Sequence, residues 1–315
     1  MLTQDSRCCY AAASKSQAGK AMSTRNNNLR GILYMIIGMA CFTLGDAFVK
    51  LAAQTLPLGQ VMLALGGGCA IVFLGMMWLK GETVLFTAFF EKPVLLRNAG
   101  EVLGATCMFA ALALTPLSTV TAIIQTAPLM MTLAAALFLK EQVGLHRFSA
   151  VIIGFIGVLI VIRPGLEGFD QYSLFALFAV VGMSMRDIGA RMARPGISTL
   201  LLSFYSAITL ALTGVVMLLV GGEIKIPSMT ASLHLLGLVA AASLGLAVVT
   251  QSVRIAEISV VSPFRYVRLL FGMTLGILVF GEVIDSYTIV GSLVTITAGI
   301  YIWVRERRLA TMADS

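Results

Sequence analysis

Residues 31–51, GILYMIIGMACFTLGDAFVKL, decide the fold class, because they form an apolar run of membrane-spanning length. A transmembrane helix needs about 20 mostly apolar residues, and this run holds only two charged ones, Asp46 and Lys50. Nine similar runs follow, and they do not alternate apolar and polar residues as barrel strands do. We therefore predict an all-α integral membrane protein in which each run is a helix. The ten predicted transmembrane helices are 31–51, 58–79, 94–114, 118–139, 147–163, 172–192, 198–220, 232–252, 259–280 and 287–304.

The composition agrees with this prediction and excludes other classes of protein. Of 315 residues, 58% are hydrophobic and 12% are charged, against roughly 45–50% and 25% in a typical soluble domain. The mean hydropathy is +0.95. These values exclude a disordered chain and a charged nucleic-acid-binding surface. We expect the partners to be a small-molecule solute and the lipid bilayer, with no nucleic acid, for a monomer or homodimer.

The basic residues predict the orientation of the chain. Cytoplasmic loops of membrane proteins carry an excess of Lys and Arg. With the N-terminus inside, 16 of the 22 Lys and Arg fall at the inner side, three at the outer side and three within spans. We therefore predict a multi-pass protein of the bacterial inner membrane with polar tails at 1–28 and 305–315, both cytoplasmic. Translation starts at Met1 or at Met22, and in the second case residues 1–21 are a dispensable extension.

An internal repeat relates the two halves of the chain. Adding 141 to the residue number places Asp46 on Asp187, Lys50 on Arg191, Gly104 on Gly245 and Glu141 on Glu282 without a gap. Each half, 31–163 and 172–304, holds five predicted helices, so the second half enters the membrane from the opposite side. Inverted repeats of this kind are typical of transporters, with the solute site near the midplane between the copies.

Four segments resemble the EamA-type transporters of the drug/metabolite transporter superfamily. They are LGDAFVK at 44–50, TAPLMMTLAAALFLKEQV at 126–143, GFIGVLIVIRPG at 154–165, and GILVFGEVIDSYTIVGSLVTITAGIYI at 276–302. The resemblance implies ten helices in two EamA-like repeats. It also implies transport of a metabolite such as an amino acid, a nucleoside, S-adenosylmethionine or riboflavin. Many relatives have an arginine early in the second helix, whereas this chain has Gln60-Val61-Met62-Leu63, so that substrate contact does not carry over.

Two acid–base pairs are candidates for the substrate path. Asp46 and Lys50 are four residues apart and share one face of a helix. Asp187 and Arg191 repeat this spacing, and Arg186 adjoins them. Such pairs either line a solute path or neutralise each other near a helix end in lipid.

Two arginines in the ninth predicted helix are the sharpest candidates. Arg265 and Arg268 lie in SPFRYVRLLFG, three residues apart on one face, with Tyr266 between them. A charge inside a membrane span marks a functional site by default. Because a guanidinium binds carboxylates and stacks on rings, we expect contact with an anionic or heteroaromatic solute. The alternative is that both side chains extend to the cytoplasmic headgroups.

Glu101 is the candidate for proton coupling, because burial of a carboxylate raises its pKa. Arg97, one turn earlier, is expected to pair with it.

We interpret Glu141 and Glu282 as structural residues that cap a following helix or hold a turn. Two further expectations concern packing and helix regularity. The glycine pairs Gly100/Gly104 and Gly272/Gly276 permit close helix contacts, and Pro128 and Pro263 break helices near their starts.

The sequence contains no motif for a cofactor, a metal site or a catalytic centre. It has no P-loop, no HExxH and no GxSxG. The five cysteines form no CxxC pair, and we expect buried thiols and no cofactor. The prediction is a secondary transporter that moves a small organic metabolite by alternating access, in the first instance by uptake of an aromatic vitamin such as riboflavin. The alternatives are transport of S-adenosylmethionine, amino acids or other metabolites in either direction, and a membrane-embedded enzyme or channel.

Overall fold

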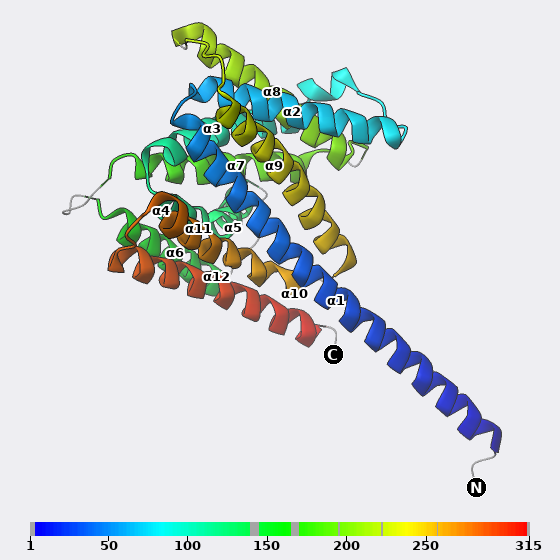
Figure 1. The fold of residues 1–315 in the computed structure, drawn as a ribbon. Coiled ribbons are helices and arrows are strands. Elements are labelled where there is room, and N and C mark those ends of the chain that lie inside the picture. The colour runs from blue at the N-terminus through cyan, green and yellow to red at the C-terminus, as the bar shows by residue number, and fades with distance from the viewer. Residues whose placement is uncertain are drawn as a thin grey trace.

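The computed structural model is an all-α bundle, as the apolar runs predict (Figure 1). It describes residues 4–138, 145–164, 170–194, 196–221, 223–256 and 258–313. Within these ranges there is no strand, and eight helices are long and apolar enough to cross a membrane. The first half contains α1 (Gln4–Ala53), α2 (Leu58–Leu79), η1 (Phe86–Phe90), α3 (Lys92–Leu114), α4 (Leu117–Ile124), α5 (Ala127–Phe138) and α6 (Leu145–Ile162). The second contains α7 (Ser173–Met192), α8 (Thr199–Gly221), α9 (Met229–Ile255), α10 (Ile258–Val261), η2 (Ser262–Tyr266), α11 (Val267–Phe280) and α12 (Ser286–Ala313).

Each of the ten predicted spans contains helix, but two of them are interrupted. The fourth divides into α4 and α5 at Gln125 and Thr126, and the ninth divides into α10, η2 and α11. The prediction for Pro263 is confirmed, since it lies in the η2 segment near the start of its span. The prediction for Pro128 is wrong in position, because the break falls near the middle of the fourth span and Pro128 lies just after it, at the start of α5. Proline suits the first turn of a helix because it has no N–H to leave unpaired.

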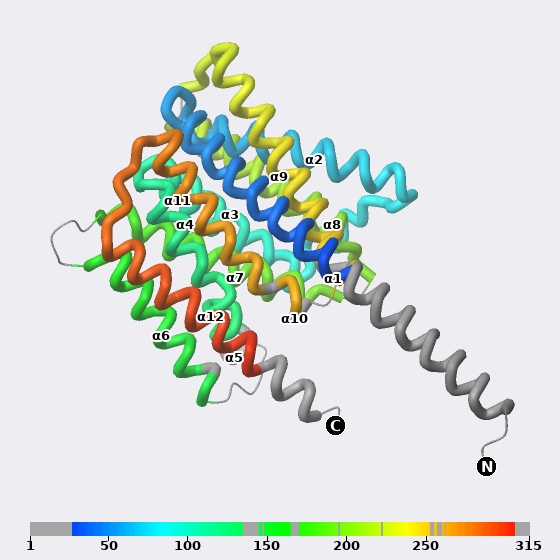
Figure 2. The backbone as a smooth tube through the Cα atoms, turned by 60° about the horizontal axis from the view of Figure 1, so that its bottom comes forward, coloured from blue at the N-terminus to red at the C-terminus, as the bar shows by residue number. Residues whose placement is uncertain are grey.

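The helices pair across the two halves of the chain. The most extensive contacts join α1 with α9, α3 with α7, α2 with α8, and α6 with α12. Figures 1 and 2 both show α6 beside α12 and α9 beside α1. Under the shift that relates the halves, α1 exchanges with α7 and α3 with α9, so the pair α3–α7 becomes the pair α9–α1. The pattern of pairing is therefore unchanged when the halves are exchanged.

Two glycines that are counterparts in the two halves make matching contacts between helices. A Cβ on Gly104 of α3 would lie 3.1 Å from the nitrogen of Met183 on α7. Its counterpart Gly245 on α9 faces Phe42 of α1, where a Cβ would lie 3.0 Å from the ring. Met183 and Phe42 are themselves counterparts under the same shift. Glycine is required at such crossings because a side chain would push the two backbones apart.

The expected packing role of the glycine pairs is confirmed. A Cβ at Gly100 would meet the backbone carbonyl of Gly182 on α7 at 2.7 Å, so α3 and α7 touch through their backbones. Gly272 lies against Thr121 of α4, and Gly276 lies against the carboxylate of Glu282. The contact between Gly272 and Thr121 places α11 and α4 side by side.

Candidate functional site

The two interrupted spans meet inside the bundle. Gln125 ends α4, and its Nε2 donates to the backbone carbonyl of Arg265 in η2 at 3.5 Å. The break after Gln125 corresponds, under the same shift, to the boundary between Tyr266 and Val267 where η2 becomes α11. Interrupted helices that face each other across a repeat interface leave backbone groups available to a solute. The crossing of these two breaks is therefore the centre of the candidate site.

An ion pair between the two halves lies next to this crossing. A terminal guanidinium nitrogen of Arg268 on α11 donates to Oδ2 of Asp46 on α1 at 2.6 Å, and each side chain is 14% exposed. The guanidinium also lies over the ring of Phe42, 5.8 Å from its centroid. The same structure leaves Nε of Arg268 buried without a partner. Arg268 is thus held by an acid from the other half, an arrangement that does not fit extension of its side chain to the headgroups.

Arg265 differs from Arg268 in having an exposed side chain. Asp187 lies within electrostatic range of its guanidinium. The neighbour of Arg265, Tyr266, points to α12, where its hydroxyl occupies the place that a Cβ on Gly299 would take.

A second charged group lies on α3 and α7. Arg186 contacts Asp187 at 2.9 Å and Glu101 at 3.9 Å, and so bridges two acids. The expected pair between Arg97 and Glu101 is wrong. The Arg97 side chain instead donates through Nε and a terminal nitrogen to the carbonyl of Leu202 on α8, at 3.2 and 3.1 Å. The Arg97 side chain is long enough to reach α8, and Glu101 is contacted by Arg186 instead.

The interpretation that Asp46 and Lys50 neutralise each other is also corrected. Asp46 pairs with Arg268, and Lys50 Nζ lies 3.4 Å from Oε1 of Glu282. Glu282 accepts hydrogen bonds from the backbone N–H of Leu117 and of Ser118. It therefore caps a helix, as expected, but the helix is α4 of the other half. Glu141, its counterpart in sequence, lies outside the described residues, and Arg191 lies in the last turn of α7.

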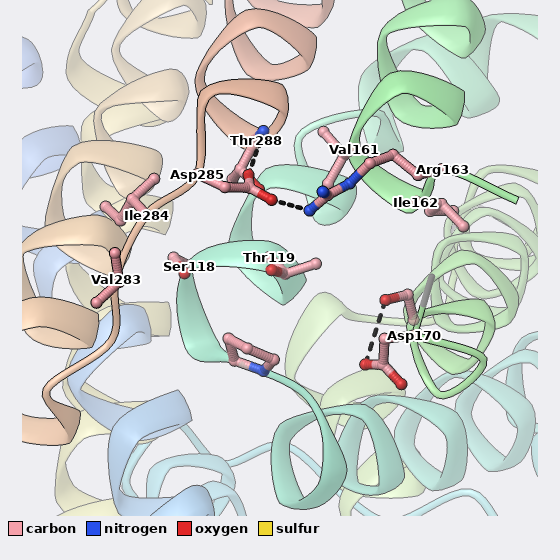
Figure 3. Close-up of a pocket in the computed structure, with 12 residues that line it drawn as sticks. Ser118, Thr119, Val161, Ile162, Arg163, Asp170, Val283, Ile284, Asp285 and Thr288 are labelled. Atoms are coloured by element: carbon pink, nitrogen blue, oxygen red, sulfur yellow. Dashed lines mark hydrogen bonds and ion pairs between the residues drawn. The ribbon is translucent and has the colours of Figure 1, made fainter. Parts of the chain in front are cut away.

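A polar cavity opens beside Ser118, at the end of the bundle where α1 ends (Figure 3). Its volume is about 130 Å³. Two acidic side chains line it, Asp285, which pairs with Arg163, and Asp170, which accepts from the hydroxyl of Ser173 at 3.4 Å (Figure 3). Asp170 also accepts from the hydroxyl of Thr115 at 2.8 Å. Arg163 also lies over the ring of Tyr287, 4.7 Å from the centroid. This cavity brings α4, α6, α7 and the loop before α12 together at one end of the protein.

Sequence reasoning missed two residues at these sites, Gln125 and Phe42, and the partners of a third, Glu282. Gln125 and Phe42 are uncharged, so a search for charges inside spans does not find them. Glu282 was found, but its partners Lys50 and Leu117 lie in the other half of the chain. The signal that had pointed to Glu282 was its match with Glu141 in the internal repeat. Among the described residues, no group of three His, Cys, Asp or Glu side chains is arranged to hold a metal ion.

Comparisons with known proteins agree on one family. A sequence model described as the EamA-like transporter family matches residues 29–163. The "S-adenosylmethionine uptake transporter" of Rickettsia felis is 25% identical over 283 residues, covering 89% of this chain and 94% of its own. The "Riboflavin transporter" of Rhizobium johnstonii is 30% identical over 295 residues, covering 88% and 92%. A solved crystal structure that is 14% identical shares the fold, with a TM-score of 0.60 over 91% of this chain and 99% of that one.

Proposed function

This chain belongs to the EamA-like transporter family of the drug/metabolite transporter superfamily, and from this premise we propose how it works. It is a multi-pass membrane protein and, as its relatives are, a small-molecule transporter. We propose that it is a secondary transporter that moves a small organic metabolite across the bacterial inner membrane by alternating access. The observation that carries this proposal is the crossing of two interrupted helices, one from each half, beside the partly buried Asp46–Arg268 pair.

The proposed architecture consists of two inverted five-helix repeats, 31–163 and 172–304. The exchange symmetry of the helix pairs and the matching contacts of Gly104 and Gly245 support it. Both termini are cytoplasmic in this proposal, because most basic residues then lie inside. The end of the bundle where α1 ends, with Lys50 and Glu282, is then the outer end.

The charges inside the spans favour a solute that accepts hydrogen bonds. Lys50 is balanced by Glu282, and Asp46 by Arg268. We counted the charged side chains in the membrane-spanning parts of α1, α3, α7, η2 and α11, without the last turn of each helix. Arginines exceed acidic residues there by one. The groups are Arg97, Arg186, Arg265 and Arg268 against Asp46, Glu101 and Asp187. Arg265 is the exposed arginine of this set, so its guanidinium is the group offered to a solute.

These features favour an aromatic vitamin such as riboflavin over S-adenosylmethionine. Riboflavin is uncharged at neutral pH and presents carbonyl groups at the edge of a planar ring, which suit both the planar fork and the stacking face of an arginine. S-adenosylmethionine carries a sulfonium and a net positive charge, which an excess of arginine opposes. S-adenosylmethionine remains the second candidate because a relative, from Rickettsia felis, is named as its uptake transporter.

Proton coupling belongs to the same proposal and uses the acids of the site. Glu101 and Asp187 share Arg186, so protonation of either acid would release the arginine to the other. The alternative energy source is the solute gradient alone. A pH gradient imposed on sealed vesicles separates the two, because only the coupled carrier accumulates solute against its gradient.

The test is flux of labelled riboflavin and S-adenosylmethionine into proteoliposomes that contain the purified protein. We expect saturable riboflavin flux that unlabelled riboflavin inhibits and that accelerates when the opposite compartment is preloaded. Flux that does not saturate and shows no such exchange would indicate a channel. Absence of riboflavin flux with saturable S-adenosylmethionine flux would transfer the proposal to the second candidate, and conversion of either solute would indicate an enzyme.

A further inference from the structure

Glu282 reaches across the bundle because of two glycines. Gly281 ends α11 in the left-handed conformation, with a φ of +65°, and its N–H bonds the carbonyl of Ile277. Glycine adopts this conformation without steric cost, so the chain turns sharply and aims the next residue back at the bundle. Gly276 leaves the space that the Glu282 carboxylate needs, since a Cβ there would lie 2.5 Å from Oε2.

The carboxylate of Glu282 closes the first turn of α4. Its Oε1 accepts from the N–H of Leu117 at 2.6 Å, and its Oε2 accepts from the N–H and the hydroxyl of Ser118 at 3.0 and 2.8 Å. The first N–H groups of a helix have no partner within the helix, and its positive end attracts an anion. A loop of the second half therefore supplies what α4 of the first half lacks.

Lys50 adds a third helix to this contact. Its Nζ lies 3.4 Å from Glu282 Oε1 and donates to the carbonyl of Thr115 at 2.6 Å, and it lies over the ring of Phe280. The side chains of Lys50 and Glu282 are 16% and 9% exposed. One cluster thus ties the end of α1 and the start of α4 to the loop between α11 and α12.

We propose that Lys50 and Glu282 form a latch that closes the transport path at the end where α1 ends, and that this end opens when the latch breaks. The proposal rests on the alternating access proposed above. The latch spans the boundary between the halves, and it lies two turns along α4 from Gln125 at the centre of the candidate site. When α1 and α4 separate from the loop, both charges and the first N–H groups of α4 become exposed together.

The energetics of the pair suit a contact that must break in every cycle. The attraction within a buried ion pair is largely offset by the cost of removing both charges from water. When this end opens, water solvates both charges again and the desolvation cost is recovered. Breaking the intact Lys50–Glu282 pair therefore changes the free energy little. The polar cavity beside Ser118 and Val283 borders the latch, and the hydroxyls and carboxylates that line it are groups that water solvates well (Figure 3).

The chemical accessibility of a buried position on α4, one turn further into the bundle than the latch, shows whether this end is open. Thr121, one turn after Ser118 on α4, is buried, and Thr121→Cys changes the side-chain volume little. In a chain whose five native cysteines are replaced by alanine, a charged thiol reagent that does not cross the membrane would be added to sealed vesicles from the outer side. The modification rate of the introduced thiol would be measured in this chain and with Lys50→Met or Glu282→Gln added. Each substitution leaves the remaining charge without its partner while this end is closed, which destabilises the closed state, and we expect a rise of roughly tenfold.

Lys225→Met is the matched control, because Lys225 is an exposed lysine at the same end of the bundle, in the loop before α9. It should leave the rate unchanged. Equal rates for Lys50→Met, Glu282→Gln and the parent would overturn the latch, whichever solute is carried, because the assay contains no solute. If instead the rates rise but no solute is transported, the latch stands as the contact that closes this end and the proposed function fails.

Discussion

The hydroxyl of Thr295 on α12 donates to the backbone carbonyl of Gly154 on α6 at 3.3 Å, and these residues are 141 positions apart. Each is therefore the counterpart of the other under the shift that relates the two halves. A residue can touch its own counterpart only at the axis that exchanges them. In the proposed architecture of two inverted repeats, the crossing of α6 and α12 therefore lies on this axis, and both helices are tied at one end by the Arg163–Asp285 pair.

Gly157, one turn further along α6, should not tolerate a methyl group. A Cβ there would lie 2.5 Å from Oγ1 of Thr295 and 2.7 Å from the carbonyl of Gly291. We expect Gly157→Ala to destabilise the protein by about 1–3 kcal/mol, the usual cost of overpacking. Thermal unfolding in detergent would measure it. Gly67→Ala is the control, since a Cβ at Gly67 meets no atom within 4 Å, and alanine favours a helix by about 1 kcal/mol over glycine. Equal melting temperatures for the two variants would contradict the prediction.

Asp46 and Arg268 should depend on each other for stability and both be required for transport. Asp46→Asn leaves the Arg268 charge buried without its partner, which costs about 3–5 kcal/mol. The double variant Asp46→Asn/Arg268→Gln removes both charges and should recover most of the stability, measured by unfolding in detergent, but not the flux. A double variant as unstable as the sum of the single variants would show that the pair is not coupled.

Arg265→Ala should lower solute flux with little effect on stability. The side chain is exposed, and the contact with Gln125 uses the backbone carbonyl of Arg265, which the substitution retains. Substitutions at such positions usually change stability by less than about 0.5 kcal/mol, so unfolding should match the parent while saturable flux falls. Lys80→Ala, at the exposed end of α2, is the control for loss of a basic residue. Normal flux in both Arg265→Ala and Asp187→Asn, with normal insertion, would exclude the proposed site.

Gly299 should be required for the position of Tyr266. A Cβ at Gly299 would collide with the Tyr266 hydroxyl and ring, so Gly299→Ala must displace η2 or α12. We expect lower stability in Gly299→Ala, and recovery when Tyr266→Leu is added, because the shorter side chain does not reach the new methyl group. The pair would be compared by thermal unfolding with Tyr266→Leu alone. Failure of the second substitution to recover stability would locate the strain elsewhere.

The sequence by itself determined the membrane class, predicted where the apolar spans lie, and showed the offset of 141 residues on which the proposed repeat rests. Each depends on local composition or on a regular offset: about 20 apolar residues must form a helix in lipid, and a constant shift between the halves can be read without coordinates. The same reasoning singled out Asp46, Lys50, Arg268 and Glu282 as charges that needed an explanation.

Only the tertiary structure decided which of these charges meet. Neighbours on one helix were the expected partners, yet Asp46 pairs with Arg268 and Lys50 with Glu282, each in the opposite half of the sequence. The physical reason is that a charge in lipid must find an opposite charge or a polar backbone group, and helix packing decides which one lies within reach. The breaks at Gln125 and Tyr266 depend on packing in the same way, because their apolar surroundings read as continuous spans until the two halves are brought together.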